Sequence, residues 1–288
     1  GTDHLDYHIN TKNYTDAKFK IFDTESPVRL IDESLKAISS NYEFIENRPY
    51  KMTSVSGKNS FSDIYYEIIE STAGRSIFKV IINNPPFGYP ENSREKYLFS
   101  CILFPEFNIH NLIFAICSIG FSSFSLEGIN DLSFLRLPRG RTELVSNISA
   151  NVIIDFAHNA EGFKFFLSSI KNYFENLVIV FGCGGDRDKS KRPVMLKIAI
   201  KNGAKVIFTT DNSRSETFKN IYNDASKGNS LDKVMVIEDR KEAIIHGSSL
   251  IGDNDCLVIL GKGHEETQEI NAKILYFSDQ EVVNEIYK

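Results

Sequence analysis

The sequence predicts an α/β protein whose C-terminal half is a doubly wound, mainly parallel sheet. Three observations support this prediction. Apolar runs without polar alternation recur in the second half, as expected of strands that are buried on both faces. Segments with helical spacing separate these runs, as in a parallel sheet with crossover helices. Glycine and charged residues follow several runs, at the strand ends where such sheets bind ligands.

The expected strands are apolar runs of about five residues, a common strand length. Each run is bounded by polar or glycine residues, which limits its extent. They cover residues 151–155, 177–181, 205–209, 233–237 and 256–260. Because helices alternate with all of them, we expect a Rossmann-like arrangement with helices on both faces of the sheet.

Helices between these strands are predicted from apolar spacing and from capping residues. Pro193 is expected to open one helix, and Gly203 is expected to end it. Asp239 and Ser278 each precede a glutamate by three residues, the capping-box pattern of a helix N-terminus. The first helix is predicted by apolar residues at positions i, i+3, i+4 and i+7, namely Phe163, Phe166, Leu167 and Ile170.

The first half of the chain has a different pattern. Residues 63–69 and 76–82 have the character of strands that form a sheet layer. Residues 107–120 predict a helix with its apolar face turned inward. The change in pattern places a domain boundary after residue 137, which gives domains at 1–137 and 138–288.

Composition and charge exclude several classes of protein. Hydrophobic residues make up 42% and charged residues 25% of the 288 residues, which excludes an intrinsically disordered chain. The formal net charge of −5 argues against a nucleic-acid-binding protein, whose surface is usually basic. No stretch approaches the roughly 18 apolar residues of a membrane helix. Four widely spaced cysteines, without a CxxC pair or a signal peptide, indicate a cytoplasmic protein with reduced thiols.

Four loops that follow predicted strands collect the chemically active residues: 155–159, 182–188, 211–214 and 261–265. We expect these loops to form one site, because the carboxyl ends of parallel strands meet at one edge of a sheet. Arginine suits a carboxylate or phosphate, while carboxylate and amide oxygens accept from an ammonium group. The mixture favours a zwitterion such as an amino acid. Helix capping, or a salt bridge inside the second loop, remains the alternative for each loop alone.

These loops resemble motifs of the Mur ligase family, and among its members those that add the third amino acid of the peptidoglycan stem peptide. The matching segments are FGCGGDRDKSKRP (181–193), DNSR (211–214), GKGHE (261–265), GRTE (140–143), DFAH (155–158), the stretch 2–18 and FNIHN (107–111). The resemblance extends over nearly the whole chain. It implies that the first half is part of an ATPase-type central domain of the family, and the second half its C-terminal domain.

The resemblance also implies an activity. It indicates an ATP-dependent ligase of cytoplasmic peptidoglycan precursor synthesis, which forms an amide bond through an acyl phosphate. The implied substrates are UDP-MurNAc-L-Ala-D-Glu and a diamino acid, with meso-diaminopimelate ahead of lysine and ornithine. The implied cofactors are ATP and Mg²⁺. We expect a monomer that binds neither nucleic acid nor a membrane.

Individual roles are carried over from the matching motifs. His4 and Lys18 match the metal site, with Lys18 carried as a carbamate that also acts in catalysis together with His158. From the residues alone, a solvated helix lysine is by far the usual state for Lys18, and Asn108 could equally be a helix cap. The nucleotide-binding positions match Asn108, Asn111, Arg141, Asp155 and His158. The positions for the incoming amino acid match Arg187, Asp211, Asn212, Arg214, Gly261 and Glu265.

The chain departs from the family pattern at two points. The UDP-binding domain and the GTNGKT-like phosphate loop have no counterpart, so we expect that this chain alone does not hydrolyse ATP at a useful rate. Ser213 replaces the proline of the DNPR motif, which leaves lysine and ornithine open as the third amino acid. Two other interpretations stay open: a non-catalytic module that binds an amino acid or nucleotide, and a folylpolyglutamate-type ligase. The DNSR and GKGHE segments argue against the latter.

Overall fold

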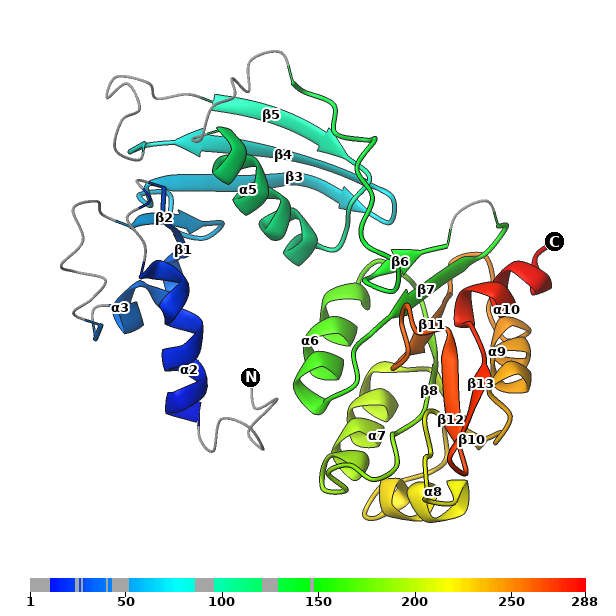
Figure 1. Ribbon diagram of the computed structural model, residues 1–288. Helices are drawn as coiled ribbons and strands as arrows, with labels where there is room; N and C mark the ends of the chain where they lie inside the picture. The colour runs from blue at the N-terminus through cyan, green and yellow to red at the C-terminus, as the bar shows by residue number, and fades with distance from the viewer. Residues whose placement is uncertain are drawn as a thin grey trace. The chain divides into compact units, whose positions relative to one another are not determined.

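The computed structural model describes residues 11–23, 26, 28–39, 41–42, 52–85, 96–120, 129–145 and 148–288. His4, which is expected at a metal site, lies outside the described residues. The chain divides into two compact units, unit 1 (Gly1–Arg136) and unit 2 (Leu137–Lys288). Each unit is built around its own sheet (Figure 1).

The described residues of unit 1 form a five-stranded sheet: β1 (Leu30–Asp32), β2 (Thr53–Ser56), β3 (Ile64–Thr72), β4 (Arg75–Ile82) and β5 (Lys96–Cys101). They lie in the order β1-β2-β3-β4-β5. The β1–β2 and β2–β3 pairs are parallel, whereas β3–β4 and β4–β5 are antiparallel. The two predicted strands of this half are confirmed as β3 and β4. Buried and more exposed residues alternate along β4, as expected of a strand with one covered face.

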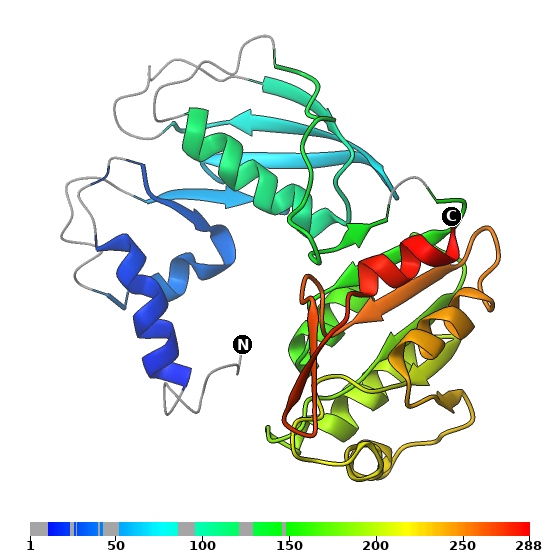
Figure 2. The same ribbon diagram turned by 45° about the vertical axis from the view of Figure 1, so that its right-hand side comes forward.

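Helices accompany this sheet. The predicted helix at 107–120 is confirmed as α5 (Glu106–Gly120), which crosses one face of the sheet (Figures 1 and 2). Ile109 and Ile113 of α5 are fully buried. The remaining helical elements are short: α2 (Thr11–Phe19), α3 (Lys36–Ser39) and the 3-10 helices η1 (Lys20–Phe22) and η2 (Glu33–Leu35).

The sheet of unit 2 has six strands: β6 (Glu143–Leu144), β7 (Asn151–Asp155), β8 (Leu177–Phe181), β9 (Lys205–Phe208), β10 (Val234–Val236) and β11 (Cys256–Leu260). Their order is β10-β9-β8-β11-β7-β6, and all neighbours are parallel except β6 with β7. The five predicted strands are confirmed as β7 to β11, with ends that differ by at most one residue. Strand β6 was not predicted, because two edge residues carry no periodicity.

Helices cover both faces of this sheet, which confirms the doubly wound fold. Helices α6 (Ala160–Ile170), α7 (Lys191–Asn202) and α8 (Phe218–Ser226) lie on one face, and α9 (Arg240–Ser248) and α10 (Asp279–Ile286) lie on the other (Figure 2). The hairpin of β12 (Thr267–Ile270) and β13 (Lys273–Tyr276) precedes α10. The predicted caps are confirmed at Asp239 and Ser278, and Gly203 caps α7. Helix α7 begins at Lys191, two residues before the predicted Pro193.

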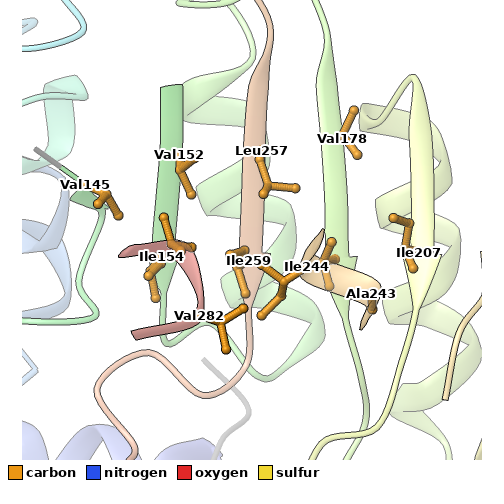
Figure 3. Packing of buried hydrophobic residues seen from close by; sticks show 12 residues of the cluster. Val145, Val152, Ile154, Val178, Ile207, Ala243, Ile244, Leu257, Ile259 and Val282 are labelled. Carbon is orange, nitrogen blue, oxygen red and sulfur yellow. The ribbon is translucent and has the colours of Figure 1, made fainter. Parts of the chain in front are cut away.

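Burial on both faces explains why the strands of unit 2 read as unbroken apolar runs. Figure 3 shows Ile154, Ile259 and Ile244 gathered between the sheet and α9, with Val282 of α10 beside them. All four predicted apolar residues of α6 are buried against the opposite face. Each such side chain contributes roughly 1.5–3 kcal/mol to folding. The sheet is therefore a rigid base from which the loops at the carboxyl ends project.

Of the helices in the described ranges, none combines the length and the hydrophobicity that crossing a membrane requires.

Candidate functional site

The four predicted loops leave the sheet of unit 2 at the same level. Leu260, the last residue of β11, pairs in register with Asp155 of β7 on one side and Phe181 of β8 on the other. Phe181 pairs in turn with Phe208, the last residue of β9. The strand ends thus form one row, and the loops that follow them start side by side. The expected convergence at the carboxyl edge of the sheet is present.

Lys262 joins the third loop to the fourth. Its side chain is 0% exposed, and its Nζ lies 3.1 Å from Glu265 Oε2 and 3.9 Å from Asp211 Oδ1. The same Nζ donates to Asn212 Oδ1 at 3.3 Å, while Asn212 Nδ2 donates to Glu265 Oε2 at 3.0 Å. A buried ammonium therefore fixes the positions of three side chains that the sequence assigned to the amino-acid site. The motif match named Gly261 and Glu265 but not Lys262.

Gly261 makes room for Asp211. Its φ of +109° lies in the region that favours glycine, and a Cβ atom there would lie 2.9 Å from Asp211 Oδ2. Asp211 is 8% exposed, and its Oδ1 accepts from the backbone N–H of Asn212 at 2.7 Å. The glycine thus allows a carboxylate of the third loop to approach the start of the fourth.

Arg214 connects the third loop to the second. Its Nη1 donates to the Gly185 carbonyl at 2.7 Å and lies 3.4 Å from the Asn212 carbonyl. Its Nε lies 3.4 Å from Glu269 Oε2 on the β12–β13 hairpin. The Arg214 side chain is 24% exposed, so part of the guanidinium faces solvent. The predicted carboxylate-binding arginine therefore lies at the same edge of the sheet as Asn212. Protein contacts hold part of its guanidinium, and the rest is exposed to solvent.

Arg187 lies exposed on the second loop. The neighbouring Asp186 accepts from the Ser215 hydroxyl at 2.7 Å, and Asp188 accepts from the Ser190 backbone N–H at 2.9 Å. Hydrogen bonds from the hydroxyl groups of Ser215 and Ser190 lower the pKa of the Asp186 and Asp188 carboxyls, respectively. Within the described residues neither acid pairs with Arg187, so the salt bridge that spacing alone allowed is not formed.

A second buried cation, Arg192 of α7, holds the loop that carries Arg187. Its guanidinium is fully buried and contacts Glu216 at 2.7 Å, Asp224 at 2.9 Å and the Gly184 carbonyl at 3.0 Å. Hydrogen bonds from Arg192 lower the pKa of Glu216 to about 2. Because Glu216 also accepts from the Asp186 N–H at 2.7 Å, Arg192 fixes the second loop directly at Gly184 and through Glu216 at Asp186.

Arg240 holds the strand end from which the fourth loop begins. It forms a bidentate pair with Asp279, at 2.8 and 2.9 Å, and neither side chain is exposed. Its Nη2 also donates to the carbonyl of Leu260, the residue before Gly261, at 3.0 Å. Arg240 thus connects the N-termini of α9 and α10 to the end of β11. No motif in the sequence marked this pair.

The first loop carries the expected nucleotide-side residues Asp155 and His158, and the third such residue, Arg141, lies in the GRTE segment before β6. Asp155 accepts from the Thr142 N–H at 2.7 Å, and burial raises the pKa of its carboxyl. The Arg141 guanidinium lies 4.5 Å from the centre of the Phe156 ring, a cation–π contact. His158 Nδ1 is 2.9 Å from the Phe156 carbonyl. The structure therefore gathers these three residues around Phe156.

The comparison with known families follows the same two units. A family model for the Mur ligase middle domain matches residues 1–119, and one for the Mur ligase glutamate ligase domain matches residues 140–263. The chain belongs to the Mur ligase family. The resemblance inferred from the motifs is thereby confirmed.

Similar Mur ligases are found in several bacteria. The chain is 36% identical to the UDP-N-acetylmuramoyl-L-alanyl-D-glutamate–2,6-diaminopimelate ligase of Wigglesworthia glossinidia brevipalpis, and 34% identical to that of Helicobacter pylori. Each comparison covers 99% of this chain but only 57% and 61% of the relative, respectively. The chain thus spans about three fifths of the length of the curated relatives it matches.

Solved structures agree with this assignment. A 2,6-diaminopimelate ligase of the same name superimposes with a TM-score of 0.68 at 28% identity, over 100% of this chain and 58% of the other. A folylpolyglutamate synthase from Thermotoga maritima gives 0.57 at 21% identity, over 83% of this chain and 52% of the other. The latter shows a shared fold alone, so the folylpolyglutamate interpretation is the weaker one.

The Mur ligase middle-domain residues are less closely gathered than those of unit 2. Lys18 is exposed on α2, with its Nζ 5.5 Å from the centre of the Tyr14 ring. On α5, Asn108 is buried and donates to the Phe104 carbonyl at 2.8 Å, while Asn111 is exposed. The expected nucleotide and metal roles of these three residues stay predictions.

Proposed function

We propose that this chain carries the amino-acid-binding part of an ATP-dependent amide ligase. The ligase adds a diamino acid to UDP-N-acetylmuramoyl-L-alanyl-D-glutamate in the cytoplasm. The names of the relatives support the reaction. The observation on which the proposal rests is the mixed-charge edge of unit 2, where Arg214 lies beside the Asp211, Asn212 and Glu265 cluster.

The charge arrangement suits a zwitterion. Glu265 Oε2 is held by Lys262 and Asn212, which leaves Oε1 as an acceptor for an ammonium group. The open part of the Arg214 guanidinium and the exposed Arg187 are donors for carboxylates. Because hydrogen bonds and ion pairs already hold the Glu265 and Arg214 side chains, little side-chain ordering is needed on binding. We therefore assign the incoming diamino acid to this edge.

The reaction that this site serves needs an activated acid. A carboxylate is a poor electrophile, and phosphorylation by ATP turns one of its oxygens into part of a leaving group. The neutral amine then attacks the acyl carbon, the C–N bond forms, and the C–O bond to phosphate breaks. The amine proton leaves with the base that accepts it, and the products are the amide, ADP and phosphate. The part proposed for unit 2 is to hold the amine in line for this attack.

The nucleotide-binding surface is proposed from fewer observed contacts than the amino-acid site. Arg141, Asp155 and His158 around Phe156 form one candidate surface, and Asn108 with Asn111 on α5 forms another. ATP would be the source of the phosphoryl group. For Mg²⁺, the described residues contain no group of three or more His, Cys, Asp or Glu side chains in ligand geometry. A metal role for His4 and a carbamylated Lys18 thus depends on the family resemblance alone.

The proposal is tested by amide formation. The purified chain, and any longer form that its gene encodes, is incubated with ATP, the UDP-linked dipeptide and meso-diaminopimelate, and the tripeptide product is quantified. Arg214→Ala should lower kcat/KM for diaminopimelate by about tenfold, equivalent to about 1.4 kcal/mol. Arg75→Ala is the matched control, because Arg75 is an exposed arginine of unit 1. No product with any diamino acid, or equal activity of both variants, would contradict the proposal.

A further inference from the structure

The β12–β13 hairpin contributes a carboxylate to the amino-acid site. The backbone N–H of Glu269 donates to Asn212 Oδ1 at 3.0 Å, and its carbonyl accepts from the Arg214 N–H at 3.0 Å. The Arg214 carbonyl accepts in turn from the Asn271 N–H at 2.8 Å. These three bonds fix the hairpin to the DNSR segment, so the Glu269 side chain is presented beside Arg214.

The Glu269 carboxylate occupies part of the Arg214 guanidinium. Its Oε2 lies 3.4 Å from Nε, while Nη1 donates to the Gly185 carbonyl at 2.7 Å. Within the described residues, Glu269 is the one carboxylate within 4.0 Å of this guanidinium. The exposed fractions of the Glu269 and Arg214 side chains are 41% and 24%, so water reaches the pair. Among those residues Nη1 donates hydrogen bonds, Nε makes the ion-pair contact with Glu269, and Nη2 has neither.

A fork that is partly occupied binds a ligand carboxylate less tightly than a free fork does. Bidentate recognition needs two adjacent N–H groups, but Nε and Nη1 of Arg214 are both engaged. A ligand carboxylate at Nη2 would also lie near the negative charge of Glu269. An ammonium group beside Glu269 is instead attracted by its carboxylate, whose negative charge offsets the positive charge of the guanidinium. The carboxylate of Glu269 thus reduces the advantage of a distal carboxylate over a side chain that ends in an ammonium group alone.

We propose that Glu269 determines side-chain specificity at this site. By shielding Arg214, it broadens the preference from meso-diaminopimelate towards lysine and ornithine, which lack the distal carboxylate. This inference rests on the function proposed above. An ion pair with this exposure contributes little to stability, so its effect is expected in selectivity rather than in folding.

The test compares Glu269→Gln with the unaltered protein, in the form of the chain that is active in amide formation. The values of kcat/KM are measured for diaminopimelate, lysine and ornithine. The diaminopimelate-to-lysine ratio should rise by about fivefold, because the neutral amide no longer repels the distal carboxylate. In an Arg214→Ala background the same substitution should raise the ratio by a smaller factor, since the part of the effect that comes from shielding Arg214 is lost.

Glu266→Gln is the matched control. Glu266 is a neighbouring exposed glutamate that pairs with Arg139 at 3.0 Å, and its removal should leave the ratio unaltered. An unchanged ratio in Glu269→Gln, or an equal loss for all three amines, would overturn the specificity role while leaving the proposed function intact. Absence of turnover with every amine in the unaltered protein would overturn the proposed function, and the inference with it.

Discussion

The two units hold their polar side chains by different means. In unit 2 the strand ends form one row, and three fully buried cations, Lys262, Arg192 and Arg240, fix the loops that follow. In unit 1 parallel pairing stops at β3, and β4 and β5 return as antiparallel strands. Loops of an antiparallel meander alternate between the two ends of a sheet. A parallel sheet therefore concentrates distant segments into one site, whereas the mixed sheet disperses them.

Unit 1 nevertheless has a polar cluster of its own. His110 of α5 lies with Nε2 3.0 Å from Asp32 Oδ2 and Nδ1 2.9 Å from the Tyr66 hydroxyl. The exposed fractions of His110 and Asp32 are 24% and 33%, in contrast to the fully buried Lys262. Water can therefore replace the partners of this cluster, and we expect it to contribute less to stability than the buried cations of unit 2.

The largest difference should follow from removing a buried cation. Arg240→Met leaves the Asp279 carboxylate buried without its partner, which typically costs about 3–5 kcal/mol. Its counterpart in unit 1 is Lys79→Met, where the pair with Glu67 is about one third to one half exposed and worth under about 1 kcal/mol. Urea unfolding of both variants measures the difference. Equal losses would show that buried cations do not distinguish the units.

Lys262→Met should have the next largest effect. It leaves Glu265 and Asn212 without a buried partner, at a cost of about 1–3 kcal/mol in the free energy of unfolding. In the active form of the protein it should also raise the KM for the diamino acid more than the KM for ATP. Lys241→Met is the control, because Lys241 forms an exposed pair with Glu285. An unaltered KM for the diamino acid would contradict the positioning role of Lys262.

The units should also differ in the direction of their pH dependence, with smaller effects. Arg192 holds the pKa of Glu216 at about 2 against an ordinary 4.5, so folded unit 2 binds fewer protons than its unfolded chain. Its stability should fall as the pH drops from about 4.5 to 2. Burial, with the nearby charge of Asp32, raises the pKa of Tyr66 from 10.0 to about 12. Unit 1 should therefore lose stability as the pH rises across that interval.

Two variants test this contrast. Glu216→Gln should reduce the loss of unit 2 stability at acid pH. Tyr66→Phe should reduce the loss of unit 1 stability at alkaline pH. Urea unfolding, followed through NMR signals of each unit across the pH range, measures both losses. If the free energy of unfolding depends on pH in the same way in each variant as in the unaltered protein, Glu216 and Tyr66 do not couple folding to pH.

The same contrast decides how much the sequence could predict. The strands of unit 2 were located to within a residue, because burial on both faces leaves unbroken apolar runs. The four loops were located because they follow those runs. In unit 1, the strands β1, β2 and β5 were not predicted. Two of them have only three or four residues, and β5 (KYLFSC) lacks a clear alternation.

The unpredicted part of the site depends on tertiary contacts. Arg240 and Glu269 are charged residues without a motif, and Lys262 lies within GKGHE but received no role; charged residues are usually solvated. Their roles depend on Asn212, Asp279 and Arg214, which lie tens of residues away in sequence. The flanking glycines of Lys262 were the one local signal, because they allow close backbone approach. Gly261 does so for Asp211.

The central claim is that the diamino acid binds at the carboxyl edge of unit 2. The most direct test is an NMR titration of the ¹⁵N-labelled protein with meso-diaminopimelate. The account predicts saturable shifts in the amides of 182–188, 211–216 and 261–269, and their loss in Arg214→Ala. Shifts confined to β1–β5 and α5 of unit 1, or the same response in Arg214→Ala as in the unaltered protein, would contradict it.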